Sequence, residues 1–533
     1  MSATSTAGAD APAPPRASAP SRPEPLHGAQ LALGTLALSA ATFMIVLDTS
    51  IANVSIPAIS GDLGVSTSQG TWVITSFAVA NAVAVPLTGW LTQRFGQVRL
   101  VTLATILFVL ASWLCGLAPN LETLILFRVL QGLSAGPLIP LSQAILLSSY
   151  PVARAGMALA MWSMTTLVAP VAGPLLGGWI TDNISWPWIF FINIPVGILS
   201  VYSIWAIYRD RETPTRKLPI DSIGLGLLVT WIAALQVMLD KGKELDWFAS
   251  TQIVVLAVVA VVGFVLFMIW EMTEEHPVVD LHLFAGRNFT VGAAALSIAY
   301  GLFFGNLVLL PLWLQTQMAY TATDAGYILA PVGFLAILLS PIVGRYVGKV
   351  DPRRIATVSF LLFAVIAWLR SRFNVQADMA TLLFPTILQG AAVACFFIPL
   401  VSITLSGLTP DKIPSASGLS NFARITASAF GTSIFTTLWD DRAALHHSQL
   451  AEAVHRGNPA AMQALANLQG AGYDATQSSA LLERLVNQQA YMLAFNDLFY
   501  ATAVIFLFLI PIVWLSHPTH RNAAAAADAG GAH

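Results

Sequence analysis

The stretch LALGTLALSAATFMIVLDTSIANVSIPAI, residues 31–59, is apolar almost throughout and contains a single ionisable side chain, Asp48. A helix needs about 20 mainly apolar residues to cross roughly 30 Å of hydrocarbon, so this stretch predicts a membrane-spanning helix with one carboxyl group inside it. The whole chain agrees, because 56% of its 533 residues are hydrophobic and 10% are charged, whereas soluble domains carry about 25% charged residues. Lipid must therefore surround most of the fold.

Composition also excludes several classes of protein. The net charge of -2 provides no basic excess for a nucleic-acid partner. The two cysteines, Cys115 and Cys395, form neither a disulfide framework nor a metal site, so we interpret them as packing residues and expect no metal. Residues 1–30 lack the short apolar core of a secretory signal, and we expect this segment and residues 517–533 to be disordered cytoplasmic tails.

Thirteen further apolar segments of spanning length follow the first, which begins near Leu31. They begin near Trp72, Val98, Leu124, Met157, Trp188, Ile220, Gln252, Val291, Thr323, Ile355, Met379, Gly418 and Phe495. The sequence therefore predicts an all-α membrane protein with fourteen transmembrane helices.

Basic residues accumulate in cytoplasmic loops, and their distribution predicts the orientation of the chain. With the N-terminus inside, the cytoplasmic segments hold Arg94, Arg99, Arg154, Arg209, Arg211, Arg216, Lys217, Arg287, Arg345, Lys349, Arg353, Arg354 and Lys412. The short outer loops then hold only Lys241, Lys243, Arg370 and Arg372. Both termini are expected to be cytoplasmic.

Two short sequence patterns each occur twice in the chain, and the distance between the two copies is nearly the same for both patterns. Gly89, Arg94 and Arg99 match Gly344, Lys349 and Arg354 at a distance of 255 residues, and Gln131-Gly132 matches Gln389-Gly390 at 258 residues. Duplicated halves with a site at their interface are typical of secondary transporters. We expect an N-terminal six-helix bundle at 31–208, two linker helices and a cytoplasmic loop at 209–289, and a C-terminal six-helix bundle at 290–516.

One outer loop, residues 440–489, is long. It alternates helix-favouring stretches with the turn signals Gly457-Asn458-Pro459 and Gly470-Ala471-Gly472, so we expect a small helical hairpin outside the membrane. This periplasmic helical loop would act either as a cap or as a docking surface for a partner in the cell envelope.

Charged side chains inside a membrane are costly and usually functional. Asp48 is the only acidic residue well inside a predicted span, the only basic ones are Arg128 and Arg424, and all nine histidines lie outside the spans. Desolvation raises the pKa of a buried carboxyl and a nearby cation lowers it again. Asp48 is therefore the candidate proton carrier; the alternative is a structural ion pair.

Several segments resemble one family. Leu47 to Val54 with Pro57 resembles the first-helix signature of the fourteen-helix drug:proton antiporters, the DHA2 branch of the major facilitator superfamily. The further matches are Gly89 to Gly96 with Arg99 in the cytoplasmic loop, Arg128 with Gln131 and Gly132 in the fourth helix, Pro170, Gly173, Pro174, Gly177 and Gly178 in the fifth, and Trp186 to Asn193 and Asp246 to Phe248 beyond them. The resemblance covers roughly residues 31–515 and implies a role in proton coupling for Arg128.

The loop motif Gly89, Arg94, Gly96 and Arg99 departs from the family pattern at Gln93, where an Asp is usual. This departure puts in doubt the charge network that locks the cytoplasmic side, and lipid phosphate is an alternative partner for Arg94 and Arg99. In the fifth helix, small residues allow close helix packing and proline permits bending. The helix would act as a gate between the halves, or would only pack tightly.

Substrate contacts are less visible in the sequence. The candidate cavity residues are Asn53, Gln131, Asn306, Gln315, Asn421 and Arg424. A broad apolar cavity with few polar anchors suits varied amphiphilic compounds. Arg424 would either attract an anionic substrate or pair with a carboxylate.

The function that these features favour is proton-driven export of hydrophobic or amphiphilic toxic compounds from a bacterial cell, across its inner membrane, with no cofactor besides the proton. The alternatives are a transporter of one dedicated metabolite, such as a siderophore or lipid, and uptake. An enzyme is disfavoured because the spans contain no histidine or acidic cluster, and an ATP-driven pump because no phosphate-binding loop occurs. The resemblance also implies a periplasmic adaptor of the membrane-fusion type and an outer-membrane channel of the TolC kind.

Overall fold

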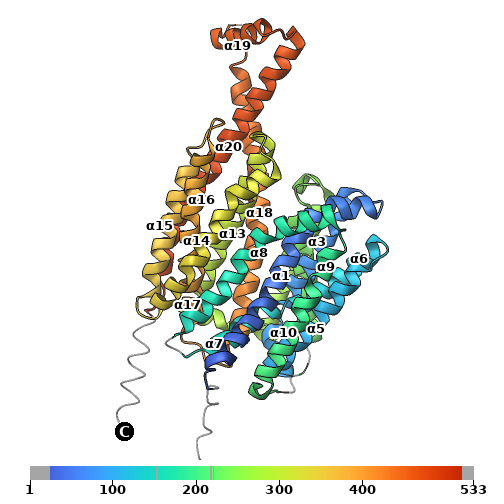
Figure 1. Ribbon diagram of the computed structural model, residues 1–533, viewed down its shortest axis with the longest axis vertical. Helices are drawn as coiled ribbons and strands as arrows, with labels where there is room; N and C mark the ends of the chain where they lie inside the picture. Colours follow the sequence, from blue (N-terminus) through green and yellow to red (C-terminus); the bar gives the residue numbers. More distant parts are fainter. Residues whose placement is uncertain (1–23, 152–153, 217–218, 220, 456, 519–533) are drawn as a thin grey trace, which may run out of the picture.

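A computed structural model describes residues 24–151, 154–216, 219, 221–455 and 457–518. Most of the two expected tails lies outside these residues, although α1 already begins at Gly28. All regular elements of the described chain are helices. They form two bundles side by side and a hairpin that projects beyond one of them (Figure 1).

The first bundle contains α1 (Gly28–Asp62), α2 (Thr67–Gly70), α3 (Trp72–Ala84), α4 (Thr88–Phe95), α5 (Gln97–Gly116), α6 (Leu121–Ala135), α7 (Leu138–Ser149), α8 (Ala155–Asn183), α9 (Trp188–Phe191) and α10 (Asn193–Tyr208). The linker contains η2 (Arg209–Arg211), α11 (Ser222–Lys241), η3 (Trp247–Ala249), α12 (Thr251–Thr273) and η4 (Leu281–Ala285). The second bundle contains α13 (Arg287–Gln317), α14 (Ala322–Val347), α15 (Pro352–Arg370), α16 (Met379–Ala394), α17 (Phe397–Thr404), α18 (Ile413–Glu452), α19 (Pro459–Gly470) and α20 (Ala475–Trp514).

Proline and glycine explain two of the breaks within these segments. Pro86 lies between α3 and α4, which are bent by 61° relative to each other, and Gly136-Pro137 lies between α6 and α7. Proline cannot donate the helical hydrogen bond and its ring clashes with the preceding turn, so the helix is interrupted at each site; α6 and α7 nevertheless form one span, Leu121–Ser149. These breaks lie at the ends of helices that carry candidate site residues.

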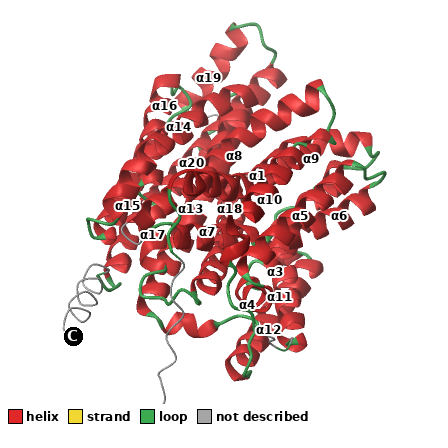
Figure 2. Cartoon of the chain, turned by 60° about the horizontal axis from the view of Figure 1, so that its bottom comes forward, coloured by secondary structure: helices red, strands yellow, loops and turns green. Residues whose placement is uncertain are grey.

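The two bundles repeat one packing scheme. In the first, α1 packs on α8 and α10, and α5 packs on α6 and α10; in the second, α13 packs on α18 and α20, and α15 packs on α16 and α20. The linker helices α11 and α12 pack against each other beside α3 (Figure 2). Their core also includes Ala416 and Leu419 of α18, so the linker touches both bundles.

Eleven helical segments of the described chain are long and apolar enough to span a membrane, or twelve if the bent pair α3–α4 forms one span. The expected starts agree with the observed helices to within a few residues, except near Phe495, where α20 begins twenty residues earlier at Ala475. The helices α8 and α18 are not among the twelve, although they pack inside the bundles. The chain is therefore an all-α, multi-pass membrane protein.

Residues 440–489, the segment predicted to be a long outer loop, are mainly helical and are built largely by continuation of two helices. The helices α18 and α20, 40 residues each, run beyond the bundle and are joined through α19 (Figure 1). Asn458 caps the start of α19, and an Asp474–Gln477 capping box starts α20, so both predicted turns are real.

Candidate functional site

A buried ion pair lies in the first bundle. Asp48 of α1 is 2% exposed and Arg128 of α6 is fully buried. The guanidinium Nη1 of Arg128 donates a hydrogen bond to Oδ2 of Asp48 at 2.6 Å. The two residues that the sequence selected for proton coupling are therefore in direct contact, although they are 80 residues apart.

Two side-chain amides complete the shell of the Asp48 carboxylate. The Nδ2 atom of Asn193, the first residue of α10, donates to Oδ1 at 2.8 Å, and Nε2 of Gln131 donates to the same oxygen at 3.0 Å. Both amides also donate to Oγ of Ser112 in α5. Residues of four helices therefore meet in this cluster, and protonation of the carboxylate would weaken its bonds to two of them, α6 and α10.

Arg128 is held from three further directions. Its Nε donates to the backbone oxygen of Val73 at 2.9 Å, and its Nη1 also donates to Oε1 of Gln131 at 2.6 Å. The ring of Phe77 lies 4.3 Å from its Cζ. Its Nη2 has no hydrogen-bond partner among the described residues, so part of this buried cation remains unsatisfied.

The fifth-helix motif packs α8 against α1 within one bundle. A Cβ atom on Gly173 would lie 2.4 Å from the Ser50 side chain, and one on Gly177 would lie 3.1 Å from Ile51. Oγ of Ser50 donates to the backbone oxygen of Pro170. By contrast, a Cβ on Gly178 would meet nothing within 4 Å. Pro174 is part of the same helix. Gly173 and Gly177 therefore face α1 within the first bundle, while the helix that carries them, α8, also packs on α14 of the second bundle.

The bundles meet through another glycine crossing. A Cβ on Gly156 of α8 would lie 2.3 Å from the backbone oxygen of Gly344 in α14, and one on Gly344 would lie 2.7 Å from that of Gly156. A second contact joins Gly89 of α4 to Ser415 of α18, where the added Cβ would lie 2.2 Å from Oγ. Gly89, a loop-motif residue, thus closes the bundles on the side where α4 meets α5.

The remaining loop-motif residues surround the start of α5. Gly96 has φ 87° and ends α4, and a Cβ there would also lie 2.3 Å from the Glu212 carboxylate. That carboxylate accepts hydrogen bonds from the backbone N–H groups of Val98 and Arg99 at 3.1 and 2.8 Å, and lies 4.0 Å from Nε of Arg99. Arg94 lies over the ring of Trp90. Glu212 therefore supplies a carboxylate close to the position where the family's Asp is replaced by Gln93.

The six candidate cavity residues fall into four settings. Gln131 belongs to the Asp48 shell, whereas Asn306 lines a small cavity inside the second bundle. Asn53 and Gln315 are exposed. Asn421 and Arg424 lie together on α18, where Nη2 of Arg424 donates to Oδ1 of Asn421 at 2.6 Å.

Arg424 lies where the bundles meet. Asn421 donates to Oε1 of Gln143 on α7 at 3.2 Å, so this contact joins the two bundles. The Cζ of Arg424 lies 4.6 Å from the ring of Tyr300 and 5.6 Å from that of Trp162. No ion pair of Arg424 occurs among the described residues, and its Nη1 lacks a hydrogen-bond partner there. Of the two alternatives, pairing with a carboxylate is therefore not the one observed.

Sequence reasoning missed several buried polar groups. The prediction that Arg370 lies in an outer loop is wrong, because this residue is the last of α15 and is 2% exposed. Glu271 of α12 is also buried, and its Oε2 accepts a hydrogen bond from the backbone of Val279, so Asp48 is not the only buried acidic group. Ser112, Gln143 and Asn193 are uncharged and were not distinguishable from other polar residues in apolar helices. The 255-residue repeat was a usable signal for Arg370, because it places this residue opposite Cys115.

Comparisons with known proteins identify the family of the chain. A family model described as Major Facilitator Superfamily matches residues 38–432. The chain is 51% identical over 511 residues to the multidrug export protein EmrB of Escherichia coli K12, covering 96% of this chain and 99% of that protein. It is 50% identical to the fatty acid resistance protein FarB of Neisseria gonorrhoeae, covering 93% and 98%.

Solved structures support the fold. The proton:xylose symporter XylE matches with a TM-score of 0.56 over 90% of this chain and 96% of that chain, at 15% identity. The human organic anion transporter MFSD10 matches with a TM-score of 0.54 over 91% and 100%, at 12% identity. At these identities the likeness concerns the arrangement of helices alone.

Proposed function

Because this chain belongs to the Major Facilitator Superfamily, we propose that it is a proton-driven exporter of hydrophobic or amphiphilic toxic compounds that works by alternating access. Relatives named as multidrug export proteins, about half identical over nearly their full length, support the substrate class. The observation that carries the coupling mechanism is the buried Asp48 carboxylate with its cation and two amides.

In the proposed cycle, Asp48 is the group that gains and loses the proton. In its charged form it holds Arg128 on α6 and the Asn193 amide on α10. Protonation removes the charge that strengthens these bonds, so α1 loosens from both helices. A ligand can shift a two-state equilibrium only if it binds the two states with different affinities. Here the affinity for the proton would differ between the states because the donors around Asp48 are close in one state and separated in the other.

The conformation described here supports an assignment to the outward-facing state. The close approaches between bundles involve the α8–α14 glycine crossing and the Gly89–Ser415 contact, on the side where α1 begins and α20 ends (Figure 1). Asn53 and Gln315, towards the other end of α1 and α13, are exposed. Rocking of the bundles would separate the glycine contacts and would cover Asn53 and Gln315.

We place fourteen spans in the bacterial inner membrane, with both termini in the cytoplasm. The twelve candidate spans become fourteen when α8 and α18 are counted, and both pack in the bundles as their neighbours do. The basic residues of the α4–α5 and α14–α15 connections lie on the proposed cytoplasmic side. The α18–α19–α20 hairpin would then extend into the periplasm and offer a surface to an EmrA-like adaptor of the membrane-fusion type, with a TolC-like channel beyond it.

The decisive experiment is transport by purified protein in proteoliposomes with an imposed pH gradient. Accumulation of a fluorescent amphiphile should require the gradient and collapse with a protonophore. Gradient-independent movement would contradict proton coupling.

The second candidate is export of one dedicated lipid-like metabolite, favoured by the likeness to the fatty acid resistance protein. A panel of structurally unrelated amphiphiles beside long-chain fatty acids separates the two functions, because only a multidrug exporter transports most of the panel.

A further inference from the structure

A second buried polar cluster lies in the C-terminal bundle, at the position that corresponds to the Asp48 cluster. Asn306 lies 258 residues after Asp48, and Gln389 lies 258 residues after Gln131. Thr386 follows Arg128 by the same interval. Arg370 follows Cys115 by 255 residues, the interval that relates Arg99 to Arg354 on the same two helices. Both Cys115 and Arg370 approach the Oε1 atom of their glutamine, at 3.7 and 2.7 Å.

The charges of the two clusters differ. In the first, Arg128 has the Asp48 carboxylate as its partner. In the second, the carboxylate position is Asn306, while the cation is Arg370, 2% exposed. No ion pair of Arg370 occurs in the described part of the chain. A buried cation without a compensating charge is unfavourable, so a negative charge from outside the described chain would stabilise this arrangement.

Arg370 has unused donors. Only its Nη2 meets acceptors among the described residues, Oγ1 of Thr386 at 3.1 Å and Oε1 of Gln389 at 2.7 Å. Its Nε is buried without a partner. The ring of Phe499, 5.7 Å from its Cζ, contributes a weak cation–π contact that does not neutralise the charge.

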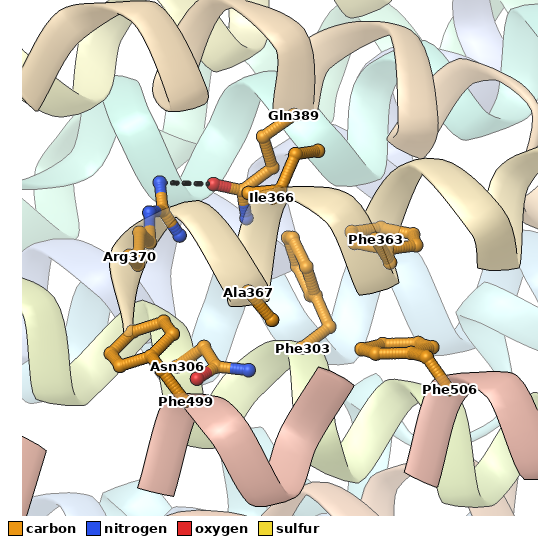
Figure 3. A pocket seen from close by; sticks show the side chains of 9 residues that line it. All are labelled: Phe303, Asn306, Phe363, Ile366, Ala367, Arg370, Gln389, Phe499 and Phe506. Carbon is orange, nitrogen blue, oxygen red and sulfur yellow. Dashed lines mark hydrogen bonds between the residues drawn. The ribbon is translucent and has the colours of Figure 1, made fainter. Parts of the chain in front are cut away.

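These unused groups face a cavity. It is lined by Phe303, Asn306, Phe363, Ile366, Ala367, Arg370, Gln389, Phe499 and Phe506 (Figure 3). Arg370 and Gln389 lie on one side of it, and Asn306 and Phe499 on the other. Its volume of about 10 Å³ corresponds to roughly one water-sized particle, which is too small for an amphiphilic substrate.

We propose that this cavity binds one small monovalent anion of the size of chloride, which neutralises Arg370 and takes the place that the Asp48 carboxylate has in the other bundle. Nε of Arg370 and the Gln389 amide donate to the ion. The Nδ2 of Asn306 donates to the backbone oxygen of Leu302 at 2.8 Å, and its Oδ1 has no partner in the described chain, so Asn306 lines the cavity without donating to the ion. Four phenylalanine side chains exclude water around it.

The test uses purified full-length protein in detergent, with gluconate replaced stepwise by chloride at constant ionic strength. A ligand that binds only the folded state raises the Tm with its concentration. The wild type should show a saturable rise of a few degrees with chloride and with bromide. No anion-specific rise in the wild type would mean that the cavity holds only water, and would overturn the proposal.

Three variants locate the ion. Asn306→Asp should raise the Tm in gluconate and abolish the chloride response, because the new carboxylate neutralises Arg370 from within. Arg370→Met should abolish the response as well. Arg424→Gln, which removes another buried cation that has no carboxylate partner in the described chain, should retain it. A chloride response that persists in Asn306→Asp, or disappears in Arg424→Gln, would place the ion elsewhere and overturn the assignment. This test requires no transport, so its failure leaves the proposed export function standing.

Discussion

At the scale of single residues, one carboxylate is surrounded by more donors than an ion pair needs. Asp48 accepts from a guanidinium and from two amides, all buried. Hydrogen bonds to an ionised acceptor are about twice as strong as neutral ones. Protonation of Asp48 would remove the charge that strengthens these bonds, so it would weaken the contacts of α1 with α6 and α10.

Asp48→Asn keeps the shape of the side chain and removes its titration. We expect pH-gradient-driven efflux to fall to background while the protein reaches the membrane in normal amounts, and Asp48→Glu to keep partial activity. Uptake of a fluorescent amphiphile into inverted vesicles measures both variants. Efflux at the wild-type rate by Asp48→Asn would remove Asp48 from the coupling mechanism and leave the structural ion pair as its role.

Arg128 should tolerate a change of shape better than a loss of charge. Arg128→Lys retains a point cation beside Asp48 but loses the fork that also reaches Val73 and Gln131. We expect partial transport from Arg128→Lys and none from Arg128→Ala, which leaves a buried carboxylate unpaired at a cost of about 3–5 kcal/mol. Transport and melting temperature should be measured together. Wild-type activity in both variants would show that Arg128 has no part in coupling.

At the scale of elements, close helix packing depends on a few glycines. In lipid, helices associate through packing rather than through the hydrophobic effect, so a missing Cβ sets how near two axes come. The α8 glycines Gly173 and Gly177 bring α8 against α1, and Gly156 with Gly344 brings α8 against α14. One helix therefore connects the Asp48-bearing helix to the opposite bundle.

Gly173→Leu should slow or block the conformational cycle, because its side chain would occupy the space of Ser50 on α1. Gly178→Leu is the matched control, since a Cβ there meets nothing within 4 Å. Labelling of single cysteines placed on each side of the membrane, in a background without Cys115 and Cys395, reports the cycle. Equal alternation of labelling in Gly173→Leu and Gly178→Leu would show that the motif only packs the bundle.

At the scale of the whole molecule, the hairpin is the feature that the bundles do not need. Its base is tied to the fold by Asp497, which pairs with Arg442 at 2.5 Å and with His446 at 2.8 Å. Higher up, His447 meets Glu483 at 2.7 Å, and α19 beyond has no buried residue. An exposed helical projection suits a partner better than it suits a cap.

Replacing residues 451–480 by a short glycine-serine linker preserves all of these pairs. We expect transport in proteoliposomes to stay intact and drug resistance of cells to be lost, because a docking interface usually buries over about 1,000 Å² and the remaining outer loops are short. Co-purification of the adaptor is the second readout. Full resistance together with a retained adaptor would move docking to another surface.

The sequence by itself determined the membrane class, the helix positions, the family, and Asp48 with Arg128. Each of these follows from local properties, since spanning length, an isolated charge or a motif can be read within 20–30 residues. Only the tertiary structure decided that Asn193 and Ser112 join the Asp48 shell, that Glu212 lies beside Arg99, and that Arg370 is buried rather than in a loop. A helix end and a loop look alike in sequence, and neutral polar residues gain a role only from partners brought close by packing of distant helices. Arg370 is buried because α13 and α20 place phenylalanines around it, and no local sequence pattern contains that information.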